Sequence, residues 1–286
     1  MTSFVLFTAW HPPARRGLAV TWEKVSHNSY DSLPETIDMD SDRLQAEFMN
    51  TVYKSASRDD VAYYVDRATT VEGPVLELGC GAGRIYLELL EAGVDADGID
   101  LSSDSLAVLR EEAEREGLDP NVWQADMTEF SADRKYALVT CPFNAIQELT
   151  TIEQQQALLE SVYDVLAPGG IFVFDTFVPD FEYIGEKWGE WQQRTVEFRG
   201  EPIEFHTCSR IVDEVAQNYV SEKEAVTQDG DQLFAFQGQA TLLPYRELEL
   251  LARLSPFESW EVTGNYTDER LTDDHSAQVW TLEKAG

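Results

Sequence analysis

The feature that most constrains this chain is a set of three alternating glycines that directly follows a short apolar run. Residues 74–78 predict a buried strand, and Gly79, Gly81 and Gly83 come next, before a helical pattern over 84–92. Glycine permits a tight turn and leaves backbone bare for a ligand, and the helix N-terminus offers unpaired N–H groups. The segment therefore predicts a ligand-binding loop at the carboxyl end of a strand.

The spacing of these glycines and the acid before them distinguish two kinds of ligand. A dinucleotide-binding loop has the pattern G-x-G-x-x-G, but Arg84 stands where its third glycine belongs. Glu77 lies two residues before the first glycine, where a carboxylate would repel a pyrophosphate. A carboxylate at this point suits an ammonium or sulfonium group. The loop therefore favours a cationic ligand over NAD.

Short apolar runs alternate with amphipathic stretches along most of the chain, which is typical of βαβ units and a parallel sheet. A helical pattern over 42–68 comes first. Further helices are predicted at 84–92, from Ser102 onward, at 152–166 and at 246–254, and strands at 74–78, 94–99, 121–124, 136–140, 171–174, 258–263 and 277–282. The sequence thus predicts a doubly wound α/β fold with a mostly parallel, seven-stranded sheet.

Residues 191–243 break this rhythm, because apolar and polar residues alternate there without a convincing helical pattern. This predicts an antiparallel β-sheet inserted after the fifth strand. We therefore expect four parts: a poorly ordered extension over 1–38, an α/β domain over 39–190, the antiparallel insert over 191–243, and a closing helix and strands over 244–286.

Two acidic residues follow predicted strands, at the edge where open α/β sheets bind ligands. Asp100 ends the second strand, and a carboxylate there can accept hydrogen bonds from both hydroxyls of a ribose. Asp126 follows the third strand, where it can accept a hydrogen bond from an exocyclic adenine amine. Together with the glycine loop, these acids predict a ligand that contains a nucleoside and a cationic group.

The charge of the chain is strongly negative, with 21 basic and 53 acidic residues and a net charge of −32. Such an excess repels nucleic-acid phosphate and costs stability unless salt screens it. We interpret it as a surface adapted to a salt-rich, halophilic cytoplasm, although a face for a cationic partner is an alternative. In a salt-rich cell the argument against a nucleic-acid substrate is weaker.

The three cysteines, Cys80, Cys141 and Cys208, are few and widely spaced. They suggest neither a disulfide framework nor a metal site, so we expect a reducing cytoplasm and no bound metal. No stretch approaches the ~18 consecutive apolar residues of a membrane span. The apolar residues 4–10 precede Arg15 and Arg16 instead of following a basic segment, which is the wrong order for a signal peptide.

Several motifs, taken together, resemble those of class I S-adenosylmethionine-dependent methyltransferases. They are VLELGCGAGR, GIDLS, QADM and LAPGGIFVFDTF, and the similarity spans roughly residues 42–178. The insert and the segment PYREL at 244–248 look like the small-molecule branch, which includes sugar N,N-dimethyltransferases. That second resemblance is looser, because it lies in the order of the predicted elements more than in identical residues. The first resemblance implies a Rossmann-like fold and S-adenosylmethionine as the cofactor.

The resemblance also implies a role for particular residues. Those expected to bind the cofactor are Glu77, Gly79, Gly81 and Gly83 at the methionine part, Asp100 and Leu101 at the ribose, Asp126 and Met127 at the adenine, and Tyr53 as a cover. Cys141 ends the strand that faces the sulfonium in this family. We expect its carbonyl to contact the cofactor. A catalytic thiolate is disfavoured, because cytosine C5 enzymes have a Pro-Cys pair and Cys141-Pro142 has the reverse order.

The acceptor side of the site is less clear from the sequence. Cys141-Pro142-Phe143 departs from the Asn/Asp-Pro-Pro-aromatic motif of enzymes that methylate nucleic-acid bases. Methyl transfer is a displacement at an activated carbon, so positioning can supply most of the rate. Candidate catalytic residues are Asn144, Gln147, His206 and Tyr245, with Tyr266, His275 and Arg210 as weaker candidates that can equally be structural or exposed.

These observations favour an enzyme that methylates nitrogen or oxygen of a small-molecule acceptor. An RNA or protein methyltransferase is one alternative, which the missing basic patch disfavours. A non-catalytic S-adenosylmethionine-binding protein is another, because fold alone does not prove catalysis. We expect the insert, with His206 and Arg210 on one strand face, to border the acceptor pocket; the alternative is a surface that pairs two copies in a homodimer.

Overall fold

The computed structural model describes residues 39–55 and 59–286, so the predicted extension over 1–38 lies outside the described residues. The helices are α1 (Met39–Lys54), α2 (Asp59–Thr70), α3 (Tyr86–Glu91), α4 (Ser103–Glu116), a short 3₁₀ helix η1 (Ala145–Glu148), α5 (Ile152–Val165), α6 (Phe181–Lys187) and α7 (Tyr245–Leu254). The strands are β1 (Val75–Leu78), β2 (Ala96–Asp100), β3 (Asn121–Gln124), β4 (Tyr136–Cys141), β5 (Leu166–Phe177), β6 (Gln192–Phe198), β7 (Glu201–Asp213), β8 (Asn218–Val226), β9 (Gln232–Thr241), β10 (Ser259–Gly264) and β11 (Ala277–Glu283).

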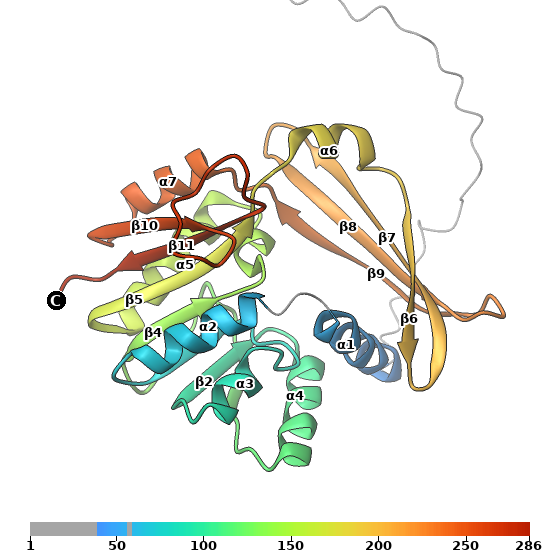
Figure 1. Cartoon of the computed structure of the whole chain (residues 1–286), viewed down its shortest axis with the longest axis horizontal. Helices are drawn as coiled ribbons and strands as arrows, with labels where there is room; N and C mark the ends of the chain where they lie inside the picture. The colour runs from blue at the N-terminus through green and yellow to red at the C-terminus, as the bar shows by residue number, and fades with distance from the viewer. Residues whose placement is uncertain (1–38, 56–58) are drawn as a thin grey trace, which may run out of the picture. The chain divides into compact units, whose positions relative to one another are not determined.

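Seven of the strands form one sheet in the order β10-β11-β5-β4-β1-β2-β3 (Figure 1). The pairs among β1 to β5 are parallel, and β11 is antiparallel to both β5 and β10. The four remaining strands form an antiparallel sheet in the order β6-β7-β8-β9. The prediction of a mostly parallel seven-stranded sheet with an antiparallel insert after β5 is confirmed.

The seven-stranded sheet is held by apolar side chains of the strands and of the helices that cover them. β1 is buried along its whole length, as a strand covered on both faces must be. Core residues also include Leu109 of α4 and Leu158 of α5, each at most 2% exposed. Burial of such a side chain stabilises the fold by about 1.5–3 kcal/mol. This packing fixes the strand ends from which the functional loops start.

The antiparallel sheet has its own apolar face, which α1 covers. Phe48 of α1 is fully buried, and its ring centroid lies 5.1 Å from that of Phe198, 5.3 Å from Phe205 and 5.2 Å from Phe234. Aromatic side chains in such edge-on contacts add to the stability gained by burial. Because α1 packs on this sheet, residues of α1 are held in fixed places relative to β6–β9.

Several element boundaries differ from the sequence-based predictions. The helical pattern over 42–68 forms two helices, α1 and α2. The helix predicted at 152–166 ends at Val165. The strand predicted at 171–174 begins earlier, at Leu166, and its pairing with β4 includes an irregularity. Helix α6 was not predicted. It is only seven residues long, and its N-cap is Asp180, whose side chain accepts hydrogen bonds from the backbone N–H groups of Glu182 and Tyr183.

Candidate functional site

A crevice of about 670 Å³ opens at the carboxyl ends of β1, β2 and β4, and we call it the carboxyl-end crevice. Its walls come from the glycine loop after β1, the end of β2, the loop after β4, and one face of α1. Phe236 of β9 also lines it, so the antiparallel sheet contributes to the wall. Open α/β sheets bind ligands at this edge, where loops from several strands converge.

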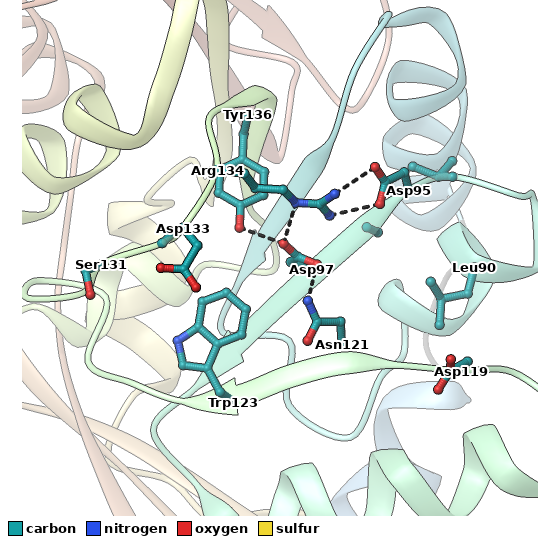
Figure 2. A pocket seen from close by; sticks show the side chains of 13 residues that line it. Leu90, Asp95, Asp97, Asp119, Asn121, Trp123, Ser131, Asp133, Arg134 and Tyr136 are labelled. Carbon is teal, nitrogen blue, oxygen red and sulfur yellow. Dashed lines mark hydrogen bonds and ion pairs between the residues drawn. The ribbon is translucent and has the colours of Figure 1, made fainter.

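A second hollow lies at the opposite, amino ends of β2 and β4, and Figure 2 shows its side chains. The carboxylate of Asp97 is 3% exposed and accepts hydrogen bonds from Arg134 at 2.8 Å, Tyr136 at 2.7 Å and Asn121 at 2.7 Å. Arg134 also binds both oxygens of Asp95. These groups satisfy one another, so we interpret this hollow as a structural network.

Glycine is required at positions 81 and 83 of the loop for two different structural reasons. Gly81 has a left-handed φ of +54°, and a Cβ there would meet only the Asp100 carboxylate, at 3.9 Å, so its free side faces the crevice. Gly83 (φ +90°) does not line the crevice; a Cβ there would lie 2.8 Å from Leu87 and 2.9 Å from Leu109. Gly81 thus leaves backbone bare for a ligand, whereas Gly83 allows the loop to pack on the helices.

The carboxylate of Asp100 is tied to the backbone of both neighbouring loops. One oxygen accepts a hydrogen bond from the Gly81 N–H at 2.7 Å, and the other accepts one from the Ser102 N–H at 2.8 Å. Burial raises the pKa of Asp100, and these two bonds oppose that shift. Each carboxylate oxygen has a further lone pair, so Asp100 can still accept hydrogen bonds from two ribose hydroxyls.

Glu77 carries a buried polar atom without a partner in the crevice. Its side chain is 2% exposed, and its Oε2 atom has no hydrogen-bond partner. Burial raises the pKa of Glu77 to about 8; Arg84 works against this shift, while Asp100 and Asp60 add to it. A buried carboxyl oxygen without a partner is costly. A bound ammonium group would satisfy Glu77, so this residue fits the amino-acid part of S-adenosylmethionine.

Arg84 brings a positive charge to the crevice, but its guanidinium is already engaged. It donates to both oxygens of Asp60, at 3.1 Å and 2.5 Å, and it lies 4.5 Å from the centroid of the Phe143 ring. Phe143 in turn contacts Tyr53 of α1 edge-on, at a centroid distance of 5.1 Å. The arginine therefore braces the loop after β4 and is not free to bind an anion.

The loop after β4 is held by a buried carboxylate, Asp175 of β5. Phe143 and Asn144 have left-handed φ values of 59° and 63°, and their N–H groups donate to Asp175 at 2.9 Å and 3.2 Å. The hydroxyls of Tyr64 and Tyr266 donate to the same carboxylate, at 2.6 Å and 3.2 Å. Asp175 is 1% exposed, and burial raises its pKa although all four bonds oppose the shift.

Most of the residues predicted to bind the cofactor lie in the carboxyl-end crevice. Those that line it are Tyr53, Glu77, Gly79, Gly81, Asp100 and Leu101. Asp126 and Met127 follow β3 but do not line it; one oxygen of Asp126 accepts hydrogen bonds from the backbone and hydroxyl of Thr128. Cys141 is fully buried, and burial raises the pKa of its thiol well above the ordinary value, which opposes a thiolate. The placing of adenine at Asp126 stays a prediction.

The candidate catalytic residues near β4 fasten the loop instead of lining the crevice. Asn144 Oδ1 accepts a hydrogen bond from the Phe177 N–H at 2.7 Å. Gln147 is 1% exposed, and its side chain donates to the carbonyl of Thr241 at 3.1 Å, which ties η1 to β9. We therefore interpret both as residues that hold the acceptor side of the site in place.

His206 and Arg210 lie on one strand face, but that face points away from the carboxyl-end crevice. His206 contacts Glu224 at 2.8 Å, its partner in the register of β7 and β8. The adjacent pair, Phe205 and Ala225, packs against α1, and successive side chains of a strand point to opposite faces. This corrects the expectation that His206 and Arg210 border the acceptor pocket.

Tyr245 and the remaining weaker candidates also lie elsewhere. Tyr245 begins α7, its ring centroid is 5.4 Å from that of Trp280, and it lines a separate hollow with Trp260. The Nδ1 atom of His275 accepts a hydrogen bond from the Thr272 N–H at 2.9 Å. Tyr266 reaches the site only through Asp175. None of the three lines the carboxyl-end crevice.

Several polar residues of the crevice were not singled out by the sequence, and Glu148 and Asn50 are the two that bear most on the acceptor. Glu148 ends η1 and lines the crevice with a side chain that is exposed to solvent; partial desolvation by the crevice walls raises the pKa of its carboxyl, Asp100 raises it further, and Lys223 of β8 opposes the shift. Asn50 of α1 is 7% exposed, and its Oδ1 atom has no partner. Asn50 precedes Tyr53 by three residues, so both lie on one face of the helix. This spacing is the sequence signal that could have identified Asn50 as a residue of the crevice.

Comparisons with known proteins agree with this geometry. Residues 75–170 match the family model described as a methyltransferase domain. The cypemycin N-terminal methyltransferase of a Streptomyces species is 29% identical over 211 residues, which cover 73% of this chain and 82% of that protein. The dTDP-3-amino-3,6-dideoxy-alpha-D-glucopyranose N,N-dimethyltransferase of Streptomyces fradiae is 29% identical over 136 residues, but the match spans only 46% of this chain and 52% of that protein.

Solved structures show the same fold. An S-adenosylmethionine-dependent methyltransferase from Clostridium acetobutylicum superposes with a TM-score of 0.69 at 14% identity, over 86% of this chain and 99% of that one. DesVI of Streptomyces venezuelae superposes with a TM-score of 0.64 at 18% identity, over 85% and 98%. Together, the methyltransferase domain over residues 75–170 and these similarities show that the protein is an S-adenosylmethionine-dependent methyltransferase.

Proposed function

We propose that this methyltransferase transfers the methyl group to the nitrogen of a small-molecule amine. The observation that carries the proposal is Glu148, a carboxyl group in the same crevice as Glu77 and Asp100, with a raised pKa. A carboxylate in this place can hold an ammonium group and accept a proton from it. A hydroxyl acceptor carries no positive charge for this carboxylate to hold.

Three of the relatives support nitrogen as the methylated atom, whereas the ubiquinone biosynthesis enzymes among the relatives are O-methyltransferases by name. The name of the cypemycin enzyme states methylation at an N-terminus, and that of the Streptomyces fradiae enzyme states N,N-dimethylation of an amino sugar. A similar sugar enzyme of Streptomyces venezuelae is 29% identical over 121 residues. These three names describe amine acceptors, one an N-terminus and two amino sugars, so they support nitrogen as the methylated atom and leave the acceptor molecule open.

The residues of the crevice divide into a cofactor part and an acceptor part. Glu77 would hold the ammonium group of S-adenosylmethionine, Gly81 would let it approach the backbone, and Asp100 would bind its ribose. Tyr53 and Phe143 would cover the reaction centre. When bound, the cofactor supplies a methyl group that is activated by attachment to a positively charged sulfur. Asp175 contributes by holding Phe143 in its left-handed turn.

Glu148 would act on the acceptor before and during transfer. An ammonium acceptor has no lone pair, so it must first lose a proton, and the Glu148 carboxylate is placed to accept it. The nitrogen lone pair then forms the new bond to the methyl carbon while the carbon–sulfur bond breaks. The raised pKa of Glu148 makes it a better proton acceptor than an ordinary glutamate.

The test measures methyl transfer to paired acceptors that differ only in having an amine or a hydroxyl. The amine should be methylated, and Glu148→Gln should lower kcat/KM for it by about 10²-fold, the lower range for removal of a general base. The affinity for S-adenosylmethionine should stay unchanged. Glu153→Gln, an exposed position at the start of α5, is the matched control. Preferential methylation of the hydroxyl, or full activity of Glu148→Gln, would refute the proposal.

We also propose that the enzyme works in a reducing, salt-rich cytoplasm. The net charge of −32 and the three cysteines, which are all free and buried, support this setting. No helix in the described part of the chain is long and apolar enough to cross a membrane. The melting temperature should rise with added KCl as screening reduces the self-repulsion; a melting temperature that falls would argue against it.

We further propose that the protein forms a homodimer in which edge strands of the four-stranded sheet pair between two copies. β6 and β9 are the outer strands of this sheet, and exposed edges can pair between copies. Light scattering of the purified protein should give twice the mass of the chain, and a mass of one chain would refute pairing.

A further inference from the structure

We infer that the acceptor is an amine without a phosphate group, because the carboxyl-end crevice offers hydrogen-bond acceptors and negative charge where a phosphate would have to enter. This inference rests on the proposed amine methylation and narrows its substrate class. It separates two kinds of acceptor, free amines and amines attached to a nucleoside diphosphate.

The charge of the crevice wall is the first ground. One basic side chain lines it within the described part of the chain, Arg84, and its guanidinium is paired with Asp60. The carboxylates that line it are Asp42, Glu77, Asp100, Asp104 and Glu148. If Glu77 and Asp100 are assigned to the cofactor, Asp42, Asp104 and Glu148 remain to face the acceptor. A diphosphate would meet repulsion from these groups.

The second ground is independent of charge. Asn50 of α1 is more than nine-tenths buried, lines the crevice, and has an Oδ1 atom without a partner. An amide oxygen only accepts hydrogen bonds. An amine or ammonium group supplies donors that satisfy it, whereas a phosphate ester has acceptor oxygens and leaves it unsatisfied. Asn50 therefore fits a ligand group that donates hydrogen bonds.

Lys223, on the antiparallel sheet, is a candidate cation for binding a phosphate. Its ammonium lies 5.2 Å from the centroid of the Phe236 ring, which lines the crevice. It also interacts with Glu148, whose pKa it lowers. One ammonium that already faces a carboxylate and an aromatic ring is a weak match for the charge of a diphosphate. We therefore interpret Lys223 as a positive charge that partly offsets the negative charge of Glu148.

The experiment compares one amino sugar in two forms, free and attached to a nucleoside diphosphate, together with a short peptide that has a free N-terminal amine. With the wild-type enzyme at low salt, kcat/KM for the better phosphate-free amine should exceed that for the phosphate-bearing sugar at least tenfold. The ratio should fall as KCl is raised, because salt screens the repulsion.

Two variants test the named residues. Asp104→Arg should raise the ratio of kcat/KM for the phosphate-bearing sugar to kcat/KM for the free amine severalfold. Asp119→Arg, an exposed position that lines the hollow at the amino ends of the strands, should leave this ratio unchanged. Asn50→Leu should raise KM for the amine, while the dissociation constant of S-adenosylmethionine stays the same. Thermal melting shows whether each variant is folded.

The outcomes separate this inference from the proposed function. Faster methylation of the phosphate-bearing sugar by the wild-type enzyme overturns the inference and leaves amine methylation intact. Methylation of hydroxyl acceptors alone overturns the proposed function. An unchanged amine KM in a folded Asn50→Leu variant removes Asn50 from the acceptor site and overturns the second ground.

Discussion

The hydroxyl of Tyr64 donates a hydrogen bond of 2.6 Å to the carboxylate of Asp175, although the two residues are 111 positions apart in the sequence. Both side chains are buried, so the bond joins α2 to the end of β5 without water. The same carboxylate accepts the N–H groups of Phe143 and Asn144. The loop that faces the reaction centre thus depends on a contact between distant parts of the chain.

Replacement of Tyr64 by phenylalanine should destabilise the protein by about 1.5–3 kcal/mol, the range for a hydrogen bond to a charged group. Urea unfolding measures this loss. Turnover should fall more than the affinity for S-adenosylmethionine, because the bond supports the loop and not the cofactor residues. Tyr183→Phe, at an exposed position of α6, is the control and should change little. Equal stability of the two variants would contradict the account.

The pKa of Glu77, about 8, predicts a proton release on cofactor binding. At pH 7 the free enzyme holds most of this proton, and a bound ammonium group would favour the ionised carboxylate. Calorimetry in buffers of different ionisation enthalpy should detect most of one proton released per S-adenosylmethionine bound. Glu77→Gln should bind more weakly and release none. Binding without proton release at pH 7 in the wild type would show that Glu77 does not meet the ammonium group.

The same pKa predicts how pH affects the stability of the free enzyme. The folded state keeps a proton on Glu77 up to about pH 8, whereas the unfolded chain loses it near the ordinary glutamate pKa of 4.5. The contribution of Glu77 to stability is therefore full below pH 4.5 and is lost as the pH rises to about 8. Denaturation of wild type and Glu77→Gln across this range should show a difference that depends on pH, with Glu72→Gln as a control. A constant difference would contradict the raised pKa.

A pair of glycines tests the loop. Gly81→Ala and Gly93→Ala both place a side chain in a left-handed backbone, at φ values of +54° and +78°, and neither Cβ meets a close neighbour. Both should lose a similar stability, on the order of 1 kcal/mol. Only Gly81→Ala should weaken the binding of S-adenosylmethionine, and Gly81→Val should abolish it. If the two alanine variants bind equally well, the loop is not the cofactor site.

The double variant His206→Ala, Arg210→Ala should keep its turnover, because both side chains lie on the far face of β7. Loss of the partly buried contact of His206 with Glu224 and of the exposed pair of Arg210 with Glu222 should cost about 0.2–1 kcal/mol of stability each. A large fall in kcat/KM with normal molar mass would instead restore the expectation that this face borders the acceptor.

The parts of the site that the sequence predicts are those formed by short runs of contiguous residues. The glycine loop after β1 and Asp100 at the end of β2 are each part of a short motif that follows an apolar strand. Their position in the fold follows once the strands are parallel, since the carboxyl ends of parallel strands meet at one edge. Glu77 is identified by its spacing to Gly79.

The parts that were missed depend on contacts between distant residues. Asp175 and Asp60 are two of 53 acidic residues, and nothing local shows that they are buried and paired. Alternation places His206 and Arg210 on one face of a strand but does not say which face meets the site. That choice is set by Phe205 and Phe48, which pack the other face against α1.

The central claim is that this chain moves a methyl group from S-adenosylmethionine to an amine bound in the carboxyl-end crevice. The most direct measurement follows a deuterium-labelled methyl group from the cofactor by mass spectrometry, with a panel of phosphate-free amines in high salt. We expect the label on nitrogen with the wild type and none with Gly81→Val, while Gly93→Ala stays active. Label on oxygen or on RNA, or equal transfer by Gly81→Val, would contradict the account.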